Sequence, residues 1–220
     1  MAKANSSVHK VLQVRTLNSS SFVIRVERKG MEFIPGQHIS LGLAQAIHTR
    51  EYSVYSGSNE DYLEILIKEV IGGLVSPALK KVKVGDLLSV GDAVGYFSIT
   101  AEDFKKDKFL FVASGTGISP FHSFAKTYPT INYKLLHGVK TIDEAYEKQD
   151  YDPKRLVICT SQDNKGDYQG RVTAYLKAFN DLDKDTTCYL CGNCNMIHEV
   201  YDILLEKGIS AENIHAEVYF

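Results

Sequence analysis

Residues 109–126 read FLFVASGTGISPFHSFAK, and this stretch decides the fold class of the second half of the chain. Phe109 to Ala113 is an apolar run of strand length, Ser114 to Gly117 is a glycine-rich turn, and Ile118 to Lys126 has helical character. A strand, a glycine turn and a helix in this order are typical of the unit that opens a parallel sheet. The glycines let the backbone approach the phosphates and ring of a ligand, although the segment lacks the six-residue Rossmann fingerprint.

The same alternation continues to the end of the chain and predicts a parallel sheet flanked by helices. Ligands of such sheets bind at the carboxyl ends of the strands. The predicted pairs of strand and helix are 133–137 with 143–148, 155–160 with 171–179, and 188–190 with 196–207.

The first half consists of short runs rich in β-branched and alternating apolar residues, separated by Gly, Pro, Asn and Asp. Six such strands close most simply as an antiparallel Greek-key barrel. Residues 74–82, entered through Gly72 and Gly73, interrupt the pattern as a predicted short helix. The predicted strands are 8–17, 21–26, 38–43, 50–55, 62–68 and 87–90.

The fold class is therefore a two-domain β + α/β protein. We expect a barrel domain over residues 1–102 and an α/β domain over residues 103–220. The charged stretch 102–108 is interpreted as the linker between them.

Composition excludes several classes of protein. The 220 residues carry 25 Lys and Arg against 27 Asp and Glu, a formal charge of −2, with 44% hydrophobic residues. Such a chain has no global field for nucleic acid, and no apolar run is long enough to span a membrane. The opening residues lack the apolar core of a signal peptide, so we expect a cytoplasmic protein with no nucleic-acid or membrane partner.

Two segments of the barrel half carry chemistry. Arg50 to Ser53 supplies a guanidinium, an aromatic ring and a hydroxyl within one strand, with Arg50 and Tyr52 on one face. Gly72 to Pro77 follows about twenty residues later and opens the short helix, whose first N–H groups can bind phosphate. Together they predict a diphosphate site.

The cysteines near the end of the chain admit two interpretations. Cys188, Cys191 and Cys194 are spaced three apart, as in some iron–sulfur or zinc sites. The first of them falls on a predicted strand, 186–190, followed by a turn at Gly192 and Asn193, and alternation along a strand favours packing over chelation. We expect free thiols and no metal.

Taken together, these segments resemble the ferredoxin-NADP reductase family, in particular its compact bacterial members. The resemblance spans nearly the whole chain. The segments that carry it are Arg50–Ser53, Gly72–Pro77, Gly115–Pro120, His137–Lys140, Tyr168–Arg171, Cys191–Asn193 with Met196, and the terminal Tyr219–Phe220. It implies an FAD-binding barrel, an NADP-binding α/β domain, and a ferredoxin or flavodoxin as electron carrier.

The resemblance also implies roles around the flavin. Arg50 would bind the FAD diphosphate with the N–H groups of the 73–76 loop, Tyr52 would pack on the flavin, and Ser53 would bond near flavin N5. Tyr219 would cover the opposite face as a movable gate, and Phe220 would stack on adenine. The residues assigned to FAD are Arg50, Tyr52, Ser53, Gly73, Leu74, Val75, Ser76, Thr116, Tyr219 and Phe220.

The catalytic residues implied are Ser53, Cys191, Glu217 and Tyr219, with Cys191 lining the hydride-transfer pocket and Glu217 managing protons. The residues assigned to NADP are Gly115, Thr116, Gly117, Lys140, Ser161, Lys165, Tyr168, Arg171, Cys191, Gly192 and Asn193. Many NADP-using relatives carry a Ser-Arg pair where this chain has Ser161 and Gln162. Lys140, Lys165 and Arg171 are the compensating cations, which favours NADPH with weakened selectivity.

Two other functions stay open. One is an NADH-dependent flavin reductase or oxygenase reductase component. The other is a non-catalytic FAD-binding regulatory subunit in which the cysteines near residue 191 hold an iron–sulfur cluster.

Overall fold

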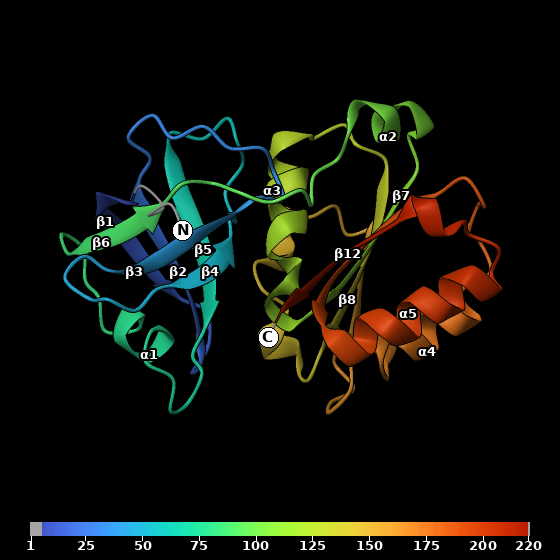
Figure 1. The fold of residues 1–220 in the computed structure, drawn as a ribbon. Coiled ribbons are helices and arrows are strands. Elements are labelled where there is room, and N and C mark those ends of the chain that lie inside the picture. The colour runs from blue at the N-terminus through green and yellow to red at the C-terminus, as the bar shows by residue number, and fades with distance from the viewer. Residues whose placement is uncertain (1–5, 220) are drawn as a thin grey trace. The chain divides into compact units, whose positions relative to one another are not determined.

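The computed structural model of the protein describes residues 6–219 and confirms the predicted fold class (Figure 1). Its contacts define two compact units. Unit 1 comprises the residues up to Ser98 together with Ser119–Tyr128, and unit 2 comprises Ile99–Ile118 together with the residues from Pro129 onward. The domain boundary expected after residue 102 stays a prediction, since the contacts group Ser119–Tyr128 with the first part of the chain.

Unit 1 contains the six-stranded antiparallel barrel. The strand order is β4-β3-β6-β1-β2-β5, and the N–H of Tyr55, just after β4, donates to the Glu64 carbonyl in β5 at 2.8 Å, so the sheet is nearly closed. Inward-facing Ile24, Ile39 and Leu41 are fully buried, as the alternation predicts. The elements are β1 (Ser6–Thr16), β2 (Ser21–Glu27), β3 (His38–Leu43), β4 (Arg50–Ser53), β5 (Tyr62–Lys68), α1 (Ser76–Leu79) and β6 (Leu87–Gly91).

Helix α3 (Ser119–Thr127) packs within unit 1 although it follows the first strand of the second half. Its Phe121 and Phe124 rings lie 6.1 and 6.3 Å from the ring of Phe97. His122 stacks on Tyr55 at 3.7 Å, and its Nδ1 lies 2.7 Å from the Tyr55 carbonyl oxygen. Amphipathicity predicts such a helix but not the surface that it covers.

Unit 2 is a six-stranded parallel sheet in the order β10-β9-β8-β7-β11-β12. Helices α4 (Val172–Ala178) and α5 (Cys194–Glu206) lie side by side (Figure 1), and their apolar residues Leu176, Val200 and Leu204 share one core with the sheet residues Val112 and Leu190. The strands are β7 (Phe109–Ser114), β8 (Tyr133–Val139), β9 (Leu156–Thr160), β10 (Tyr168–Gln169), β11 (Thr187–Asn193) and β12 (Ile214–Tyr219).

Strand order places the switch point of the sheet between β7 and β11. The chain proceeds from β7 through β8 to β9 on one side, and then crosses β7 to lay down β11 and β12 on the other. The loops that leave β7 and β11 therefore diverge at the carboxyl edge, where doubly wound sheets bind ligands.

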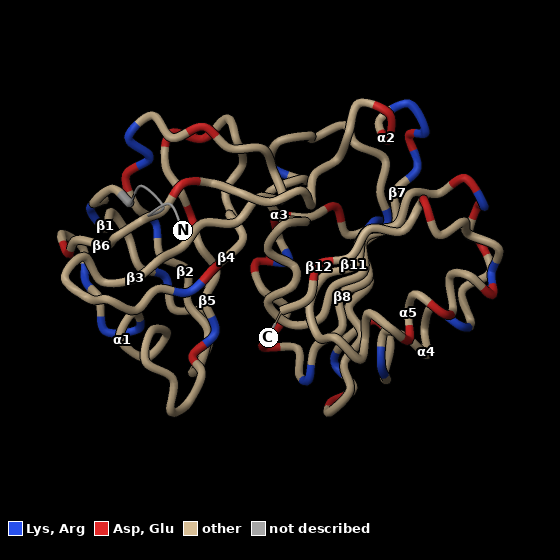
Figure 2. Tube along the Cα trace, in the orientation of Figure 1, with Lys and Arg blue, Asp and Glu red and all other residues tan. Residues whose placement is uncertain are grey.

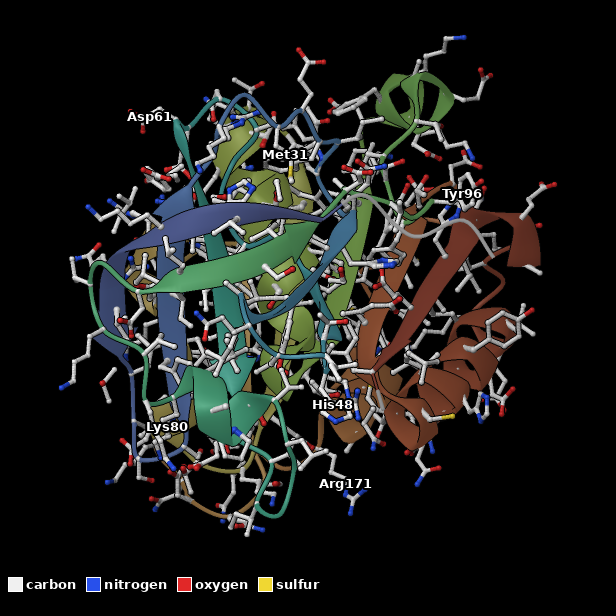
Figure 3. All side chains as sticks on the ribbon, turned by 60° about the vertical axis from the view of Figure 1, so that its left-hand side comes forward. Met31, His48, Asp61, Lys80, Tyr96 and Arg171 are labelled. Atoms are coloured by element: carbon white, nitrogen blue, oxygen red, sulfur yellow. The ribbon has the colours of Figure 1, made fainter. Side chains whose placement is uncertain are left out.

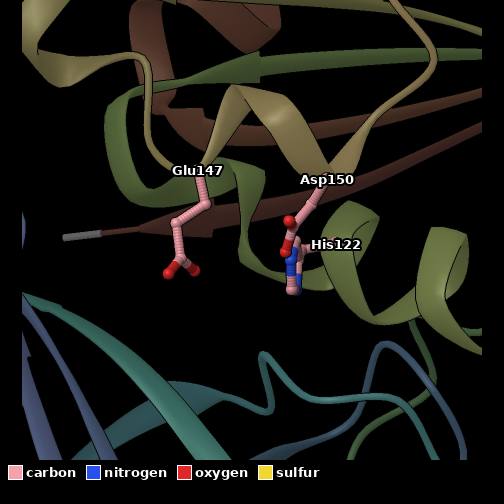
Figure 4. A group of neighbouring side chains, drawn as sticks. All are labelled: His122, Glu147 and Asp150. Atoms are coloured by element: carbon pink, nitrogen blue, oxygen red, sulfur yellow. The ribbon is translucent and has the colours of Figure 1, made fainter.

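Two predicted segments of unit 2 are wrong. Residues 143–148 form no α-helix but two 3-10 turns, η2 (Ile142–Glu144) and η3 (Lys148–Asp150), because Glu147 takes a left-handed conformation with φ 42°. Figure 4 shows Glu147 and Asp150 at η3, and His122 on α3. The charged stretch 102–108 is no linker but contains helix α2 (Ala101–Lys106), which begins with a capping box formed by Thr100 and Asp103.

Two further boundaries differ from the prediction. The helix expected over 74–82 shortens to α1, four residues with Pro77 in its first turn. The turn expected at Gly192 and Asn193 does not occur, since β11 continues through both residues and α5 begins at Cys194. Figure 2 shows Lys and Arg interspersed with Asp and Glu along the described chain, and no helix in residues 6–219 is both long and apolar enough to cross a bilayer.

Candidate active site

Strand β4 presents the predicted FAD residues of unit 1. Pairing with β3 sets Arg50 opposite Leu41 and Tyr52 opposite Ile39, so both side chains lie on the core-facing side of the strand. Arg50 is exposed at the strand end and donates to the Thr49 carbonyl at 2.9 Å. Its remaining donors fit the oxygens of a diphosphate.

Tyr52 and Ser53 differ in environment. Tyr52 is half-buried against the barrel core, and burial raises its pKa to about 12 while the nearby Arg50 charge lowers it. The phenol is therefore neutral and offers an apolar ring beside a cation. Ser53 is buried on the opposite side of the strand and pairs with His38.

The 73–76 loop only partly fits its predicted role. The Gly73 N–H donates to the Val70 carbonyl at 2.9 Å, so this N–H is already used inside the loop. The Ser76 hydroxyl oxygen accepts the Val70 N–H at 2.9 Å and holds the loop closed from the other side. Among the described residues, the N–H groups of Leu74, Val75 and Ser76 donate to no other group, and they remain for a phosphate.

In unit 2, the glycine segment predicted to approach a nucleotide leaves β7 as a tight 3-10 turn, η1 (Gly115–Ile118). Gly115 has φ +54° and a Cβ there would meet nothing within 4 Å, so a side chain would project into open space. Gly117 is packed instead, since a Cβ would lie 2.3 Å from the Cys191 carbonyl oxygen. The turn thus lies directly against the end of β11.

The end of β11 is fixed by Ser114, which the sequence places at the start of the glycine-rich turn but to which it assigns no site role. Its hydroxyl oxygen accepts the Asn193 N–H at 2.9 Å, and a Cβ on Gly192 would lie 2.4 Å from the same oxygen. Asn193 itself caps α5, because its side-chain oxygen accepts the N–H groups of Asn195 and Met196. Its predicted nucleotide role is therefore shared with a structural one.

Three of the four predicted catalytic residues come together on β11 and β12. In the parallel register Cys191 lies opposite Glu217, and Asn193 lies opposite Tyr219. Burial raises the pKa of the Cys191 thiol well above its ordinary value, the Glu217 charge raises it further, and a hydrogen bond from the Tyr219 side chain lowers it. Cys191 is thus a neutral thiol at the sheet edge. Phe220 lies outside the described residues.

Cys159 and Cys188 are packing residues of the core, whereas the partly buried Cys194 lies on α5 with its Sγ 3.9 Å from His198 Nε2. All four thiols are reduced, and burial raises the pKa of both Cys159 and Cys188 to about 12. Cys188 belongs to the core shared with α5, whereas Cys191, three positions along the strand, faces the other way. The strand therefore directs these two thiols away from a common ligand.

The predicted cations for a 2′-phosphate lie at the carboxyl ends of β8 and β9. Lys140 follows β8, Lys165 lies between β9 and β10, and both are exposed, as is Arg171 at the start of α4 (Figure 3). The Ser161 hydroxyl already donates to the Val139 carbonyl at 3.3 Å. The Tyr168 ring packs edge-on against Tyr175 at 5.4 Å.

An acidic residue that the sequence analysis gave no role lies among these cations. The Asp163 carboxylate accepts the Ile142 N–H at 2.8 Å and the Lys165 N–H at 3.0 Å. These backbone hydrogen bonds, that of Ile142 first, hold its pKa below the ordinary value. A fixed negative charge therefore lies beside the cations.

Comparison with known families assigns FAD binding to the first half of the chain and NAD binding to the second half. The family described as "Oxidoreductase FAD-binding domain" matches residues 9–99, and the family described as "Oxidoreductase NAD-binding domain" matches residues 111–202. The two matches follow one another and together cover most of the chain.

Curated relatives belong to several electron-transfer systems. The chain is 25% identical over 225 residues to the toluate 1,2-dioxygenase electron transfer component of Pseudomonas putida, covering 95% of this chain and 66% of that protein. It is 27% identical over 211 residues to a flavohemoprotein of Oceanobacillus iheyensis, covering 85% of this chain and 51% of that protein. The chain thus spans about half to two thirds of the length of these relatives.

A solved structure shares the fold over its whole length. The ferredoxin NADP+ reductase from Neisseria gonorrhoeae with bound FAD and NADP superposes with a TM-score of 0.86 at 23% identity, covering 99% of this chain and all of that one. With an FAD-binding barrel followed by a pyridine-nucleotide-binding α/β unit, this chain belongs to the ferredoxin-NADP reductase family of FAD-dependent oxidoreductases.

Proposed function

We propose that this chain carries electrons between NADPH and a one-electron carrier protein, a ferredoxin or a flavodoxin, in the cytoplasm. The observation that supports it most is the carboxyl edge of the parallel sheet, where η1 closes on Gly192 beside Cys191, Glu217 and Tyr219. When bound, FAD supplies the step that accepts a hydride as two electrons and releases the electrons singly.

The residues of this chain bind and orient the two dinucleotides. Arg50 and the N–H groups of Leu74, Val75 and Ser76 bind the FAD diphosphate, and the neutral Tyr52 ring packs on the flavin. Ser53 donates a hydrogen bond near flavin N5. Apart from Tyr52, whose burial supports its assignment, these roles rest on the family resemblance.

Unit 2 presents the nicotinamide. The open backbone at Gly115 lets the nucleotide approach the sheet, Thr116 and Gly117 lie in the same turn, and the buried Cys191 thiol lines the pocket without a charge. Glu217 exchanges the proton that accompanies flavin reduction, and Tyr219 moves aside when nicotinamide approaches.

Nucleotide preference depends on a balance of charges at the ends of β8 and β9. The exposed Lys140, Lys165 and Arg171 favour the 2′-phosphate of NADPH. The fixed Asp163 carboxylate opposes it. We therefore propose a preference for NADPH that is weaker than usual in the family.

A parallel assay tests this proposal. Purified protein loaded with FAD is supplied with NADPH or NADH, and electron delivery is followed as ferredoxin-linked or flavodoxin-linked reduction of cytochrome c, with free flavin as the third acceptor. The expected result is a higher kcat/KM for NADPH and turnover that depends on the carrier protein. A clear NADH preference, or equal rates without any carrier, contradicts it.

The second candidate is an NADH-dependent reductase component of an oxygenase system. Asp163 favours it, because a carboxylate at the end of β9 repels a 2′-phosphate and can accept hydrogen bonds from the ribose hydroxyls of NADH. The similarity to a dioxygenase electron transfer component gives it further support. The same assay distinguishes the two through the nucleotide ratio.

A further inference from the structure

A buried histidine, His137, contacts η1, the glycine turn proposed to bind the nucleotide. His137 lies near the end of β8 with 1% of its surface exposed, and its Nε2 is 2.9 Å from the carbonyl oxygen of Gly115, 22 residues earlier. A carbonyl oxygen only accepts hydrogen bonds, so Nε2 carries the proton and donates it. None of the roles assigned above uses this imidazole.

The Gly115 carbonyl fixes the orientation of the turn. Gly115 is the first residue of η1 and takes a left-handed conformation with φ +54°. Because the peptide bond is planar and trans, holding this carbonyl toward β8 turns the N–H of Thr116 in the opposite direction, away from the imidazole. One hydrogen bond therefore determines the direction of both the Gly115 carbonyl and the Thr116 N–H, at the point where a nucleotide would approach.

The charge of the imidazole suits this position. Burial lowers the pKa of His137 to about 4, and the hydrogen bond to Gly115 and the charge of Glu144 offset this only in part. Tyr146 also faces the ring, with its ring centroid 6.1 Å away. At neutral pH the histidine is a neutral donor, so it shapes the turn without adding a charge to the nucleotide site.

We propose that His137 is a positioning residue for the pyridine nucleotide: its Nε2–H holds the Gly115 carbonyl and thereby orients the Gly115–Thr116 peptide toward the bound dinucleotide. The inference rests on the proposed function of this sheet edge as the nucleotide site. It predicts that the hydrogen bond, not the volume of the ring, determines nucleotide affinity.

Three variants test it with the FAD-loaded protein. His137→Leu removes the donor, His137→Gln keeps a donor near the position of Nε2, and His137→Asn keeps an amide too short to reach. His9→Leu is the matched control, since His9 in β1 is equally buried and its Nδ1 contacts the Glu27 carbonyl oxygen at 2.5 Å in unit 1. Turnover is measured with ferricyanide, which makes the identity of the carrier irrelevant, and NADP+ binding is measured by calorimetry.

His137→Leu and His137→Asn should each raise the nucleotide KM and the NADP+ Kd about 10-fold, as expected when a buried carbonyl loses its donor. Saturating kcat should change by less than about 3-fold, because the bond orients the nucleotide and takes no part in the chemistry. His137→Gln should return KM to within about 3-fold of the wild type, and His9→Leu should leave it unchanged.

An unchanged KM and Kd in His137→Leu and His137→Asn would overturn the inference, and so would a loss in His137→Gln equal to theirs. If His137→Leu fails to fold, the comparison of His137→Asn with His137→Gln decides the matter. A wild type that binds NADP+ without oxidising NADPH refutes the proposed function alone, because the Kd values still test His137. A wild type that binds no pyridine nucleotide refutes both.

Discussion

Arg50 is the one cationic residue of strand β4. Its exposed guanidinium donates a hydrogen bond to the carbonyl of the neighbouring Thr49. Arg50→Ala should therefore weaken FAD binding about 10- to 100-fold, the range expected for losing charge-assisted hydrogen bonds to phosphate. Titration of the apoprotein with FAD, followed by flavin fluorescence, measures this. Arg171→Ala, at the start of α4 in unit 2, is the control, and equal FAD affinity in both variants would contradict the assignment.

Asp163 makes a second prediction at the residue scale. Asp163→Asn removes the negative charge and keeps one of the two oxygens that accept the N–H groups of Ile142 and Lys165. The ratio of kcat/KM for NADPH to that for NADH should rise several-fold, because the repulsion of a 2′-phosphate disappears. Lys140→Ala should change the ratio in the opposite direction. A ratio that stays constant in both variants would place the 2′-phosphate elsewhere.

Single residues also mark the limit of the sequence analysis. Arg50, Cys191 and Glu217 stand next to recognisable glycine or aromatic segments, so the family resemblance could identify them. Ser114 and His137 act through hydrogen bonds to backbone groups 79 and 22 residues away, and no local pattern signals such partners.

At the scale of elements, turn η1 packs directly against the end of strand β11, at the edge of the sheet proposed to bind the nucleotide. At Gly117 an added Cβ would lie 2.3 and 2.6 Å from the carbonyl oxygen and carbon of Cys191, and these are backbone atoms that cannot move cheaply. At Gly115 a Cβ meets open space, although its φ of +54° strains any other residue.

Gly117→Ala should therefore destabilise the protein by about 1–3 kcal/mol, the usual cost of overpacking. Gly115→Ala should cost only about 1 kcal/mol, for backbone strain. Urea unfolding measures both. An alanine at 117 that proves as harmless as one at 115 would show that η1 does not pack against β11 in solution.

Elements with strong periodicity were predictable, and those defined by tertiary contacts were not. The alternating apolar residues of β3 and β5 predicted their bounds directly, because these residues, such as Ile39 and Ile65, lie in the barrel core. The segment around η2 and η3 has helical composition, yet the buried Tyr146 and Tyr151 and the left-handed Glu147 break it into short turns. Helix α3 follows the first strand of the parallel sheet in sequence. Its contacts with Tyr55 and Phe97 are what show that it belongs to the barrel unit.

For the whole molecule, two histidines whose pKa is lowered by burial, His137 and His215, predict how stability depends on pH. An imidazole of the unfolded chain titrates near pH 6.5. Burial lowers the pKa of His137 in the folded protein to about 4, and burial also lowers that of His215, offset by Asp103. The unfolded state then binds more protons than the folded state between about pH 6.5 and 4, so stability is fully present above this window and is lost as pH falls through it.

His137→Gln should flatten this acid slope, because glutamine does not titrate and can keep the hydrogen bond to Gly115. The unfolding free energy of the wild type should fall by up to ~1.4 kcal/mol per pH unit for each such histidine, and the variant should lack one of these contributions. Urea unfolding at pH 7.5, 6, 5 and 4.5 measures the two slopes. The two proteins should differ little at pH 7.5, with the variant relatively more stable at pH 4.5. Parallel slopes across the series would mean that folding does not lower the pKa of His137, and thus that its ring does not stay neutral as the pH falls from 6 to 4.5.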